Sequence, residues 1–443
     1  MKLKNIVALV LFLFFSASSF SFALTASEEK KYGKEMYQEI IQSAPVNNDA
    51  YISLHVVAIK DRLEPEAMLL FPVTLTIIDS STLDAFATPG GYVYVTTGLI
   101  ALCDKEEELA GVLAHEFGHV KKRHVAKMME KQKYINIGML TTMLLGALVG
   151  GGSTPGAVIA SGMAGAQTMS LKFSREDEAE ADREGSIIAD KAGYGGLGGA
   201  EFLKKLRAAG GDKLYPQYLL THPYHETRII TLESMWKNNR VTIDAPLFPY
   251  LVARAKILHQ SRSTSTDETF INNYLKDKGN PVNNYSAALI YSLKGDAEAS
   301  IRTAGENTSP FKNLFLGEML IRARKFQEAA GVLKNESDPI ARFYLSRAYE
   351  GMSENQMAVA TLKGLTFYGS AFPEIYYRLG MLYGRNGEEA RGYEYLGRYH
   401  LGTGKFTQAR AEFEKAISRY GINSPDAREV IRLLDDMKDE KKK

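Results

Sequence analysis

The most informative stretch of the 443-residue chain reads His115-Glu116-Phe117-Gly118-His119, after a mostly apolar lead-in at 108–114. Two histidines at i and i+4 lie on one helix face, where both imidazoles can bind one Zn²⁺. Glu116, one residue along, can act as general base on a metal-bound water without binding the metal. Because short patterns recur by chance, two surface histidines on an amphipathic helix remain the alternative for this stretch taken alone.

A second, acidic helix offers the third ligand that a catalytic zinc needs beside an open position for water. Glu178 and Asp182 stand at i and i+4 in a helix predicted over 174–192, which begins with a capping-box pattern. We expect Glu178 to bind the metal and Asp182 to accept a hydrogen bond from a ligand histidine, which fixes that histidine's tautomer. The neighbouring Glu176 and Glu180 are expected on a solvated acidic face.

Two segments before the histidine motif predict a small sheet. Val73–Ile78 and Tyr92–Thr96 are rich in β-branched residues and alternate with period two, and Gly90-Gly91 precedes the second strand. We expect Tyr92–Thr96 to be an edge strand that an extended substrate joins by main-chain pairing. Helices are predicted over 28–41, 105–131 and 200–209.

The last third of the chain repeats itself with the spacing of tetratricopeptide helices. Small residues at 317, 346, 380 and 397 stand 29, 34 and 17 positions apart, near a 34-residue period with one uneven step. Small side chains at these positions let neighbouring helices approach closely in a stacked solenoid. An ordinary helical domain with accidental matches is the alternative.

These patterns predict an α+β zincin-type metallopeptidase domain with a small sheet, followed by an all-α solenoid of tetratricopeptide-like repeats. The polar segment Ser261–Glu268 is expected to be a hinge between them. The predicted bounds are a signal peptide at 1–23, the peptidase domain at 24–240, a linker with the first helices at 241–282, and the repeats at 283–440.

The N-terminus has the layout of a secretory signal peptide. Lys2 and Lys4 precede an apolar run at 6–15, and cleavage is expected near Ala23. We therefore predict export to the bacterial periplasm. The formal net charge of +2 gives no basic footprint for nucleic acid. The single cysteine, Cys103, allows no intramolecular disulfide and is expected to be a small apolar residue at a helix start.

Residues 134–171 carry no charge. Pro155 and several glycines break the segment into two pieces that are too short for a transmembrane span. We expect a helical hairpin that is buried against the catalytic core or the repeats, or that forms a lid or touches the membrane beside the active site. A true span is the less favoured alternative.

Four motifs follow one another in a fixed order: Asp84-Ala85-Phe86-Ala87-Thr88-Pro89-Gly90-Gly91, the HEFGH helix, Ser174-Arg175 with Glu178-Ala179-Glu180-Ala181-Asp182, and Thr221-His222-Pro223 with Arg228-Ile229. In this order they resemble the gluzincin peptidases related to the HtpX membrane protease and the CAAX prenyl protease. Four ordered motifs are far more specific than the histidine pentapeptide alone.

The resemblance implies roles for residues at matching positions. His115, His119 and Glu178 would bind one Zn²⁺ per chain, with Glu116 as the base. His222 would lie near the metal, as a transition-state donor or as a fourth ligand in a latent state, and Arg228 would steady the oxyanion.

Some polar residues near the motifs depart from the family pattern. Asp84 stands where many relatives have Asn, and an ionised Asp cannot donate the hydrogen bond that an Asn could give to substrate. His124 and His225 have no matching role and are expected to be solvated or structural.

Residues and resemblance together predict a periplasmic zinc endopeptidase that acts on misfolded or stalled exported proteins in unfolded or extended form. The repeats would recruit clients or an outer-membrane protein assembly complex. A chaperone or scaffold whose protease site is latent, with His222 capping the zinc, is the alternative. A repeat adaptor with an inactive metal site is the third and weakest possibility, since every catalytic residue type is present.

Overall fold

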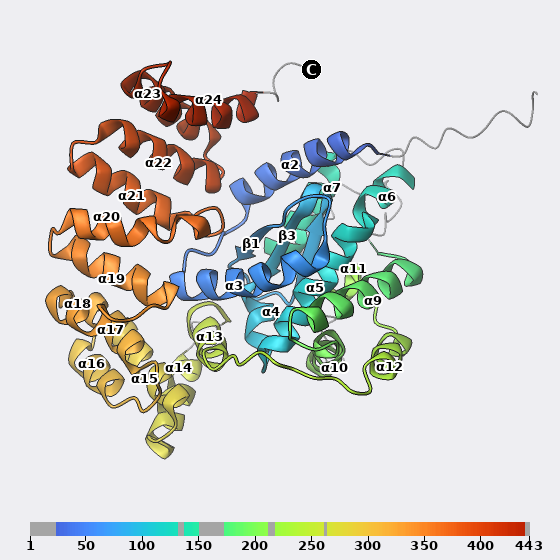
Figure 1. Cartoon of the computed structure of the whole chain (residues 1–443). Helices are drawn as coiled ribbons and strands as arrows, with labels where there is room; N and C mark the ends of the chain where they lie inside the picture. Colours follow the sequence, from blue (N-terminus) through green and yellow to red (C-terminus); the bar gives the residue numbers. More distant parts are fainter. Residues whose placement is uncertain (1–23, 132–136, 150–171, 211–217, 261–263, 439–443) are drawn as a thin grey trace, which may run out of the picture.

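A computed structural model of the protein describes residues 24–131, 137–149, 172–210, 218–260 and 264–438. The predicted signal peptide and the second half of the uncharged segment lie outside these ranges. Figure 1 shows an N-terminal part built around a small sheet, with stacked helices beside it. One hydrophobic core runs from Ala50 in the first part to Tyr383 in the second, so the two parts pack against each other.

The N-terminal part combines short strands with helices on both sides of them. Its described elements are α2 (Ala26–Ser43), α3 (Ala50–Ala67), β1 (Thr74–Ile78), β2 (Ala85–Thr88), η1 (Pro89–Gly91), β3 (Tyr92–Thr96), α4 (Thr97–Leu102), α5 (Glu106–Lys122), α6 (His124–Lys131), α7 (Ile137–Val149), α9 (Arg175–Lys191), α10 (Gly198–Gly210), α11 (Tyr218–Thr221) and α12 (Glu226–Met235).

The sheet has the strand order β1-β3-β2, and this corrects one prediction. β3 pairs in parallel with β1 and antiparallel with β2, so the strand expected at the edge lies in the centre. The missed strand, β2, is only four residues long and contains two alanines, which have weak strand propensity. Gly90 and Gly91 have φ of 80° and 89°, a region that glycine tolerates, and they form the tight connection from β2 to β3.

The helix predicted over 105–131 is interrupted at Arg123. α5 ends there because Arg123 adopts a left-handed conformation with φ of 54°, and α6 starts at the next residue. The Arg123 guanidinium group donates to the buried Glu29 carboxylate and to the Leu24 carbonyl, both from the N-terminal end of the described chain. These distant partners favour the break, which a local pattern cannot indicate.

Small residues bring α5 and α9 into close contact. A Cβ atom on Gly118 of α5 would lie 2.6 Å from the Ala181 carbonyl oxygen, and one on Gly185 of α9 would lie 2.8 Å from that of Ala114. Ser174 caps α9 in a capping box, as predicted. The apolar face of α5 is fully buried, so this pair of helices crosses in the centre of the first part.

α7 is the described piece of the uncharged segment. Its Leu140 and Leu144 are buried in a second apolar cluster with Met36 and Ile40 of α2 and Phe86 of β2. This agrees with a helix packed against the catalytic part. Among the described helices, none is long and apolar enough to cross a membrane.

The second part is helical throughout its described residues. It comprises α13 (Phe248–Ala255), the π-helical turn η2 (Lys256–Gln260), α14 (Thr264–Lys276), α15 (Pro281–Leu293), α16 (Ala297–Gly305), α17 (Lys312–Arg322), α18 (Phe326–Leu333), α19 (Pro339–Gly351), α20 (Asn355–Lys363), η3 (Thr366–Tyr368), α21 (Glu374–Arg385), α22 (Glu389–Gly402), α23 (Phe406–Tyr420) and α24 (Pro425–Lys438).

Small residues lie where these helices meet, as the repeat pattern predicted. A Cβ atom on Gly317 would contact the Leu333 side chain, and one on Gly397 would contact Phe413. Identification of the helices as tetratricopeptide repeats stays a prediction. The expected hinge is wrong in part, because 264–268 belong to α14. Polar residues at a helix start carry little hydrophobic periodicity, so the helix was not recognised.

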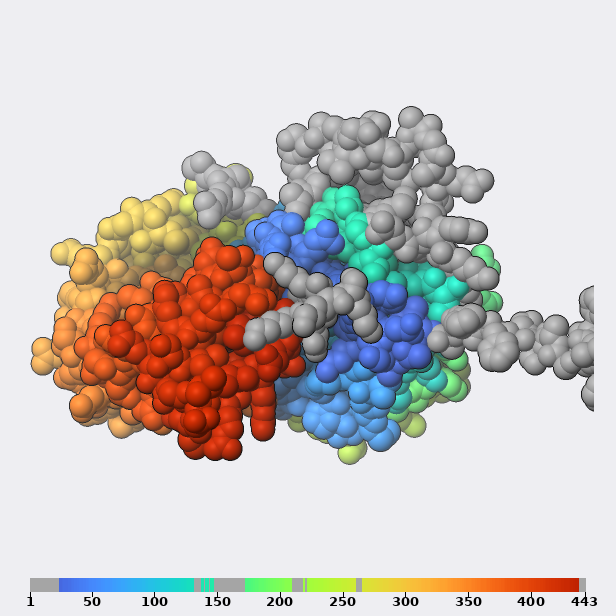
Figure 2. Space-filling view, turned by 90° about the horizontal axis from the view of Figure 1, so that it is seen from above, coloured from blue at the N-terminus to red at the C-terminus, as the bar shows by residue number. Residues whose placement is uncertain are grey.

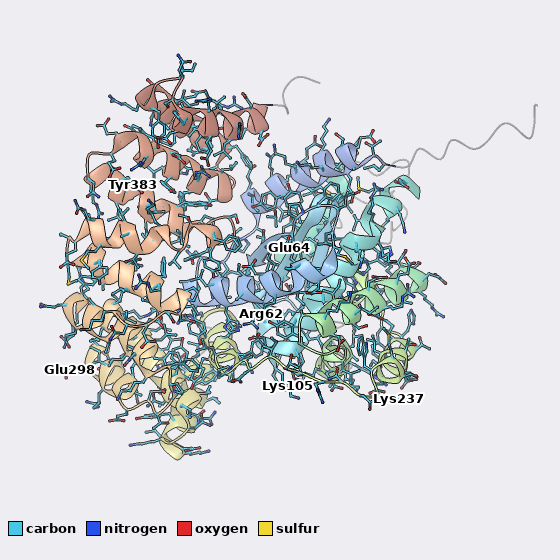
Figure 3. All side chains as sticks on the ribbon, viewed as in Figure 1. Arg62, Glu64, Lys105, Lys237, Glu298 and Tyr383 are labelled. Atoms are coloured by element: carbon cyan, nitrogen blue, oxygen red, sulfur yellow. The ribbon has the colours of Figure 1, made fainter. Side chains whose placement is uncertain are left out.

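A buried cluster of charges joins the two parts. Arg254 of α13, 1% exposed, donates to Asp49 at 2.6 and 2.7 Å and to Glu318 at 2.9 Å. Asp49 caps α3, and Glu318 belongs to α17. Figure 3 shows α3, with Arg62 and Glu64 labelled, extending from the helical array across the sheet.

The far end of the array also contacts the first part. Lys34 of α2 donates to the Asp436 carbonyl of α24. Figure 2 shows the C-terminal helices beside α2. The array therefore meets the N-terminal part at both of its ends.

Arg254→Ala is expected to lower the free energy of unfolding by about 3–5 kcal/mol, because it removes a counter-charge that buried Asp49 and Glu318 share. Urea unfolding followed by circular dichroism measures this loss. Arg302→Ala, on the exposed face of α16, is the control and should change stability by less than about 0.5 kcal/mol. Similar small losses in both variants would contradict this account.

Candidate metal centre and active site

Four buried side chains from three segments converge at one point. His115 and His119 come from α5, Glu178 comes from α9, and His222 follows α11. One ligand atom from each lies within 4.8 Å of the other three. The closest approaches are His115 Nε2 to His119 Nε2 at 3.0 Å, His115 Nε2 to His222 Nδ1 at 3.3 Å, His222 Nδ1 to Glu178 Oε1 at 3.0 Å, and His119 Nε2 to Glu178 Oε1 at 3.5 Å.

These spacings fit a four-coordinate metal ion. Around a tetrahedral zinc with bonds of about 2.0–2.1 Å, neighbouring ligand atoms lie roughly 3.3 Å apart. Burial lowers the pKa of both His115 and His119, so both imidazoles are neutral, as ligands must be. A carboxylate and imidazole lone pairs facing one buried point form a donor set that a cation would stabilise. The residues present therefore fit a metal ion.

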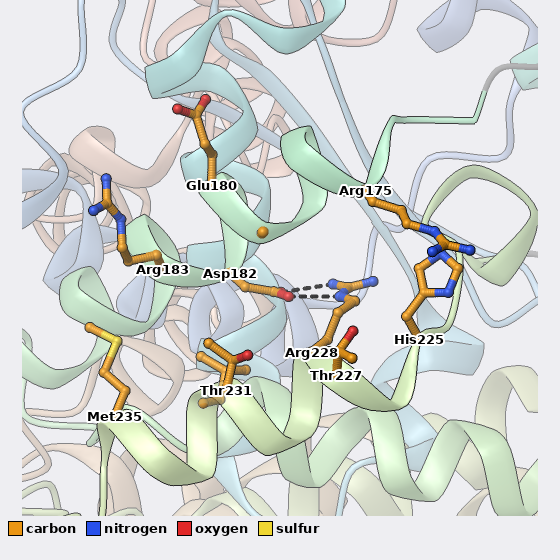
Figure 4. Close-up of a pocket in the computed structure, with 11 residues that line it drawn as sticks. Arg175, Glu180, Asp182, Arg183, His225, Thr227, Arg228, Thr231 and Met235 are labelled. Atoms are coloured by element: carbon orange, nitrogen blue, oxygen red, sulfur yellow. Dashed lines mark hydrogen bonds and ion pairs between the residues drawn. The ribbon is translucent and has the colours of Figure 1, made fainter.

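A buried arginine and the Asp182 carboxylate lie behind the ligands. Asp182 Oδ1 lies 3.0 Å from His115 Nδ1, the place expected for it. Arg228 of α12 donates to both Asp182 oxygens at 2.7 and 2.8 Å, as Figure 4 shows, and its Nη1 lies 2.6 Å from Glu178 Oε2. Burial opposes ionisation of Asp182, but Arg228 and His115 outweigh it and lower the pKa of Asp182 to about 2.

Arg228 makes contacts that its predicted role did not include. Its Nε and Nη2 atoms donate to Asp182, and its Nη1 atom donates to the Pro223 carbonyl oxygen at 3.3 Å and forms an ion pair with Glu178. The guanidinium group thus holds Asp182 and contacts the ligand Glu178, and its expected contact with the oxyanion stays a prediction. The sequence places Arg228 after His222 but contains no sign that α9 would supply its partners.

Glu116 lies beside the four ligands and is fully buried. Neither of its carboxylate oxygens has a hydrogen-bond partner among the described residues, and its Oε1 lies 3.5 Å from His222 Nε2. Burial raises the pKa of Glu116 to about 7, so near neutrality the group is poised to take up and return a proton. This is the environment expected of a general base.

Asp84, just before β2, is a further buried carboxyl group near this site. Burial raises its pKa to about 7, and its Oδ1 has no hydrogen-bond partner among the described residues. A protonated Asp84 can donate a hydrogen bond, as the Asn of many relatives can. The departure from the family pattern is therefore smaller than the sequence suggests.

His124, expected to be solvated or structural, is buried against a ligand, which agrees with the structural alternative. Its Nδ1 lies 3.0 Å from His119 Nδ1, and its Nε2 lies 3.2 Å from Glu180 Oε2. Glu180, whose side chain is 45% exposed, lies on a solvated face as expected and also contacts His124. The sequence does show a histidine five residues after His119. Its contact with His119 could be predicted only with knowledge of the helix break at Arg123.

Two other residues that the sequence drew attention to lie outside the ligand cluster. His225 lines a pocket of about 370 Å³ between α9 and α12, together with Arg175 and Arg228 (Figure 4). Cys103 is buried at the C-terminal end of α4, where its thiol donates to the Leu99 carbonyl.

Comparison with known proteins identifies the class. Residues 55–236 match Peptidase family M48, and this span holds every ligand described above as well as Glu116 and Arg228. The chain therefore carries an M48 peptidase domain and is a metalloendopeptidase.

Several known proteins are similar to this chain over different lengths. The "Beta-barrel assembly-enhancing protease" of Escherichia coli is 26% identical over 78% of this chain and 74% of its own. The "Putative beta-barrel assembly-enhancing protease" of Vibrio cholerae is 32% identical over 55% of this chain and 51% of its own. The "Mitochondrial metalloendopeptidase OMA1" of Arabidopsis thaliana is 32% identical over 34% of this chain and 29% of its own.

The low pKa of Asp182 predicts a pH-dependent contribution to stability. Because the folded pKa, about 2, lies below the ordinary value of 3.8, the contribution is present above pH 4 and is lost as pH falls toward 2. Near neutral pH and without metal, the free energy of unfolding of the wild type should be about 2 kcal/mol larger than that of Asp182→Asn. Urea titrations with chelator at several pH values test this, and a difference that stays constant down to pH 3 would contradict it.

Proposed function

We propose that the protein is a zinc-dependent endopeptidase that cleaves unfolded or extended segments of exported proteins. The observation that carries the proposal is the buried Glu116 carboxyl group beside the His115, His119 and Glu178 ligand atoms. Two imidazoles and one carboxylate in tetrahedral spacing are a donor set typical of catalytic zinc. Membership of the M48 family supports the same reaction class.

The chain's own residues account for the proton transfers. Zinc, when bound, polarises the scissile carbonyl and lowers the pKa of water. Glu116 would take the proton from that water and deliver it to the leaving amine, so that the carboxylate returns to its starting state. Arg228 holds Glu178 and Asp182 in place during this exchange and supplies positioning rather than a contact with the reacting atoms.

The substrate would pair with β2 rather than with the central β3. β2 is hydrogen-bonded to β3 along one side, and among the described strands it has no partner along the other. The Ala87 backbone of β2 also lies next to Glu116. An extended chain added to β2 would pass beside the base, and main-chain pairing reads little side-chain identity.

The proposed client proteins are inferred from the names of the relatives, and the proposed location is inferred from the predicted signal peptide. Two relatives carry names that refer to β-barrel assembly, and export after cleavage near Ala23 would place this chain in the periplasm. We infer that the helical array recruits misfolded or stalled outer-membrane proteins, or their assembly complex. Contact with a membrane surface through 134–171 belongs to the same proposal.

The position of His222 supports a second candidate, a chaperone or scaffold with a latent site. His222 Nδ1 occupies the fourth vertex of the ligand set, within 3.3 Å of His115 Nε2 and 3.0 Å of Glu178 Oε1. A fourth protein ligand leaves no open position for water, and catalytic zinc sites need one. Activity would then require His222 to move away from the metal.

Glu116→Gln is expected to retain bound zinc and to lose casein cleavage by about 10²–10⁴-fold, because the amide cannot accept the water's proton. Metal analysis and casein digestion of the mature protein measure both properties, and chelator should abolish the wild-type reaction. Glu107→Gln on the same helix is the control. Undiminished cleavage by Glu116→Gln would remove Glu116 from the mechanism.

His222→Ala separates the two candidates. If His222 caps the metal in a latent enzyme, the variant should digest casein faster than wild type, because a position for water opens. His225→Ala, outside the ligand set, should digest casein at the wild-type rate. Slower digestion by His222→Ala would show that His222 assists catalysis and does not inhibit it.

A further inference from the structure

The two metal-ligand histidines are supported by different partners. A ligand histidine nearly always donates its second ring N–H to a carboxylate, a carbonyl or a water, which fixes the ring and its tautomer. His115 has the Asp182 carboxylate for this purpose. The corresponding nitrogen of His119, Nδ1, faces another imidazole, that of His124, at 3.0 Å.

The donors and acceptors along this contact follow from the ligand role of His119. His119 presents Nε2 to the metal, so its Nδ1 carries the proton and donates to His124 Nδ1. His124 Nδ1 must then accept, and the His124 proton lies on Nε2. That nitrogen faces Glu180 Oε2 at 3.2 Å and Asp177 Oδ1 at 3.6 Å, both of which are acceptors.

We propose that His124 is a positioning residue of the metal centre. Carboxylates of α9 fix the orientation of the His124 ring, and this ring in turn fixes the orientation of the ligand His119. The inference rests on the metal site but not on the nature of the substrate. His124 touches neither substrate nor metal in this role.

The fold places His124 by means of the break at Arg123. In a continuous helix a residue five positions after His119 would lie roughly 140° around the axis and could not reach its ring. The left-handed Arg123 redirects the chain so that His124 folds back onto His119. The Arg123 guanidinium group is held by the Glu29 carboxylate and the Leu24 carbonyl, which stabilises this break.

The surroundings exclude water from this contact. The His124 side chain is fully buried, and the Phe173 ring packs 4.1 Å from that of His119 and 6.2 Å from that of His124. A solvent molecule therefore cannot readily replace the imidazole as the acceptor for His119. Removing His124 should leave the His119 N–H buried without a partner, which is costly.

The first experiment compares two substitutions at the same position. His124→Leu removes the acceptor, whereas His124→Asn carries a carbonyl oxygen near the position of Nδ1. Competition of zinc with a chromophoric chelator should show a loss of affinity of about 10–100-fold for His124→Leu. His124→Asn should recover most of that loss, and Glu176→Gln, an exposed residue at the start of α9, should match wild type.

A spectroscopic readout separates positioning from general stability. With Co²⁺ in place of zinc, the visible absorption bands report coordination geometry, and they should change for His124→Leu and return toward wild type for His124→Asn. Wild-type zinc affinity and an unchanged cobalt spectrum in folded His124→Leu would overturn the proposal. Failure of His124→Asn to rescue the affinity or the spectrum would also overturn it. The loss in His124→Leu could then not be attributed to the missing acceptor.

A measurement on wild type covers the case in which His124→Leu does not fold. Long-range ¹H–¹⁵N correlation spectra of the zinc-bound protein report which ring nitrogen carries each proton. We expect the proton on Nδ1 of His119 and on Nε2 of His124. A proton on Nδ1 of His124 would contradict the relay regardless of the behaviour of the variants or of peptidase activity.

Discussion

The close contact between α5 and α9 is the constraint on which the site depends. Gly118 and Gly185 allow the two backbones to approach within a distance that any side chain at those positions would prevent. Because the helices touch there, Glu178 reaches the same point as His115 and His119, although 59 residues of chain separate it from His119. The metal centre is thus a consequence of backbone packing, and its ligands are fixed by two rigid helices.

One helix provides most of the polar support around the metal. α9 supplies the ligand Glu178, the Asp182 carboxylate behind His115 and the Glu180 carboxylate behind His124. The two ligand imidazoles are electrically unequal, since His115 faces an ionised carboxylate held by Arg228, whereas His119 faces a neutral ring. An imidazole backed by a charge is the stronger electron donor to a metal. The arrangement gives the site a built-in asymmetry.

The sequence predicted the parts of the fold whose signals are local. The capping box of α9, the spacing of His115 and His119 and the alternation of β1 and β3 all lie within a few residues. What it missed depends on distant partners. Arg123 breaks a helix where Glu29 and Leu24 bind it, and β3 is central because a short, alanine-containing β2 adds to it.

The candidate site divides in the same way. His115, Glu116 and His119 lie within two turns of α5, so their spacing along the chain fixes their relation, whereas Glu178 and His222 reach them only through the packing of other segments. The contacts of Arg228 and His124 were not predicted, since they depend on which carboxylates of α9 these two residues face. These side-chain contacts arise where two helices pack together, so they cannot be predicted from either segment of the sequence alone.

The burial of Arg254 has a practical consequence for dissecting the protein. A fragment beginning at Thr264 would retain Glu318, Tyr285 and Tyr344 but would lack the guanidinium group that all three contact. In the fragment, buried Glu318 would keep Arg322 but lose Arg254 as a counter-charge. The fragment would therefore misreport how the array behaves in the intact chain. A fragment that contains only the array should begin ahead of Phe248, so that it keeps Arg254. It would still need another acceptor for Arg254 in place of Asp49, because the ion cluster is shared between the two parts.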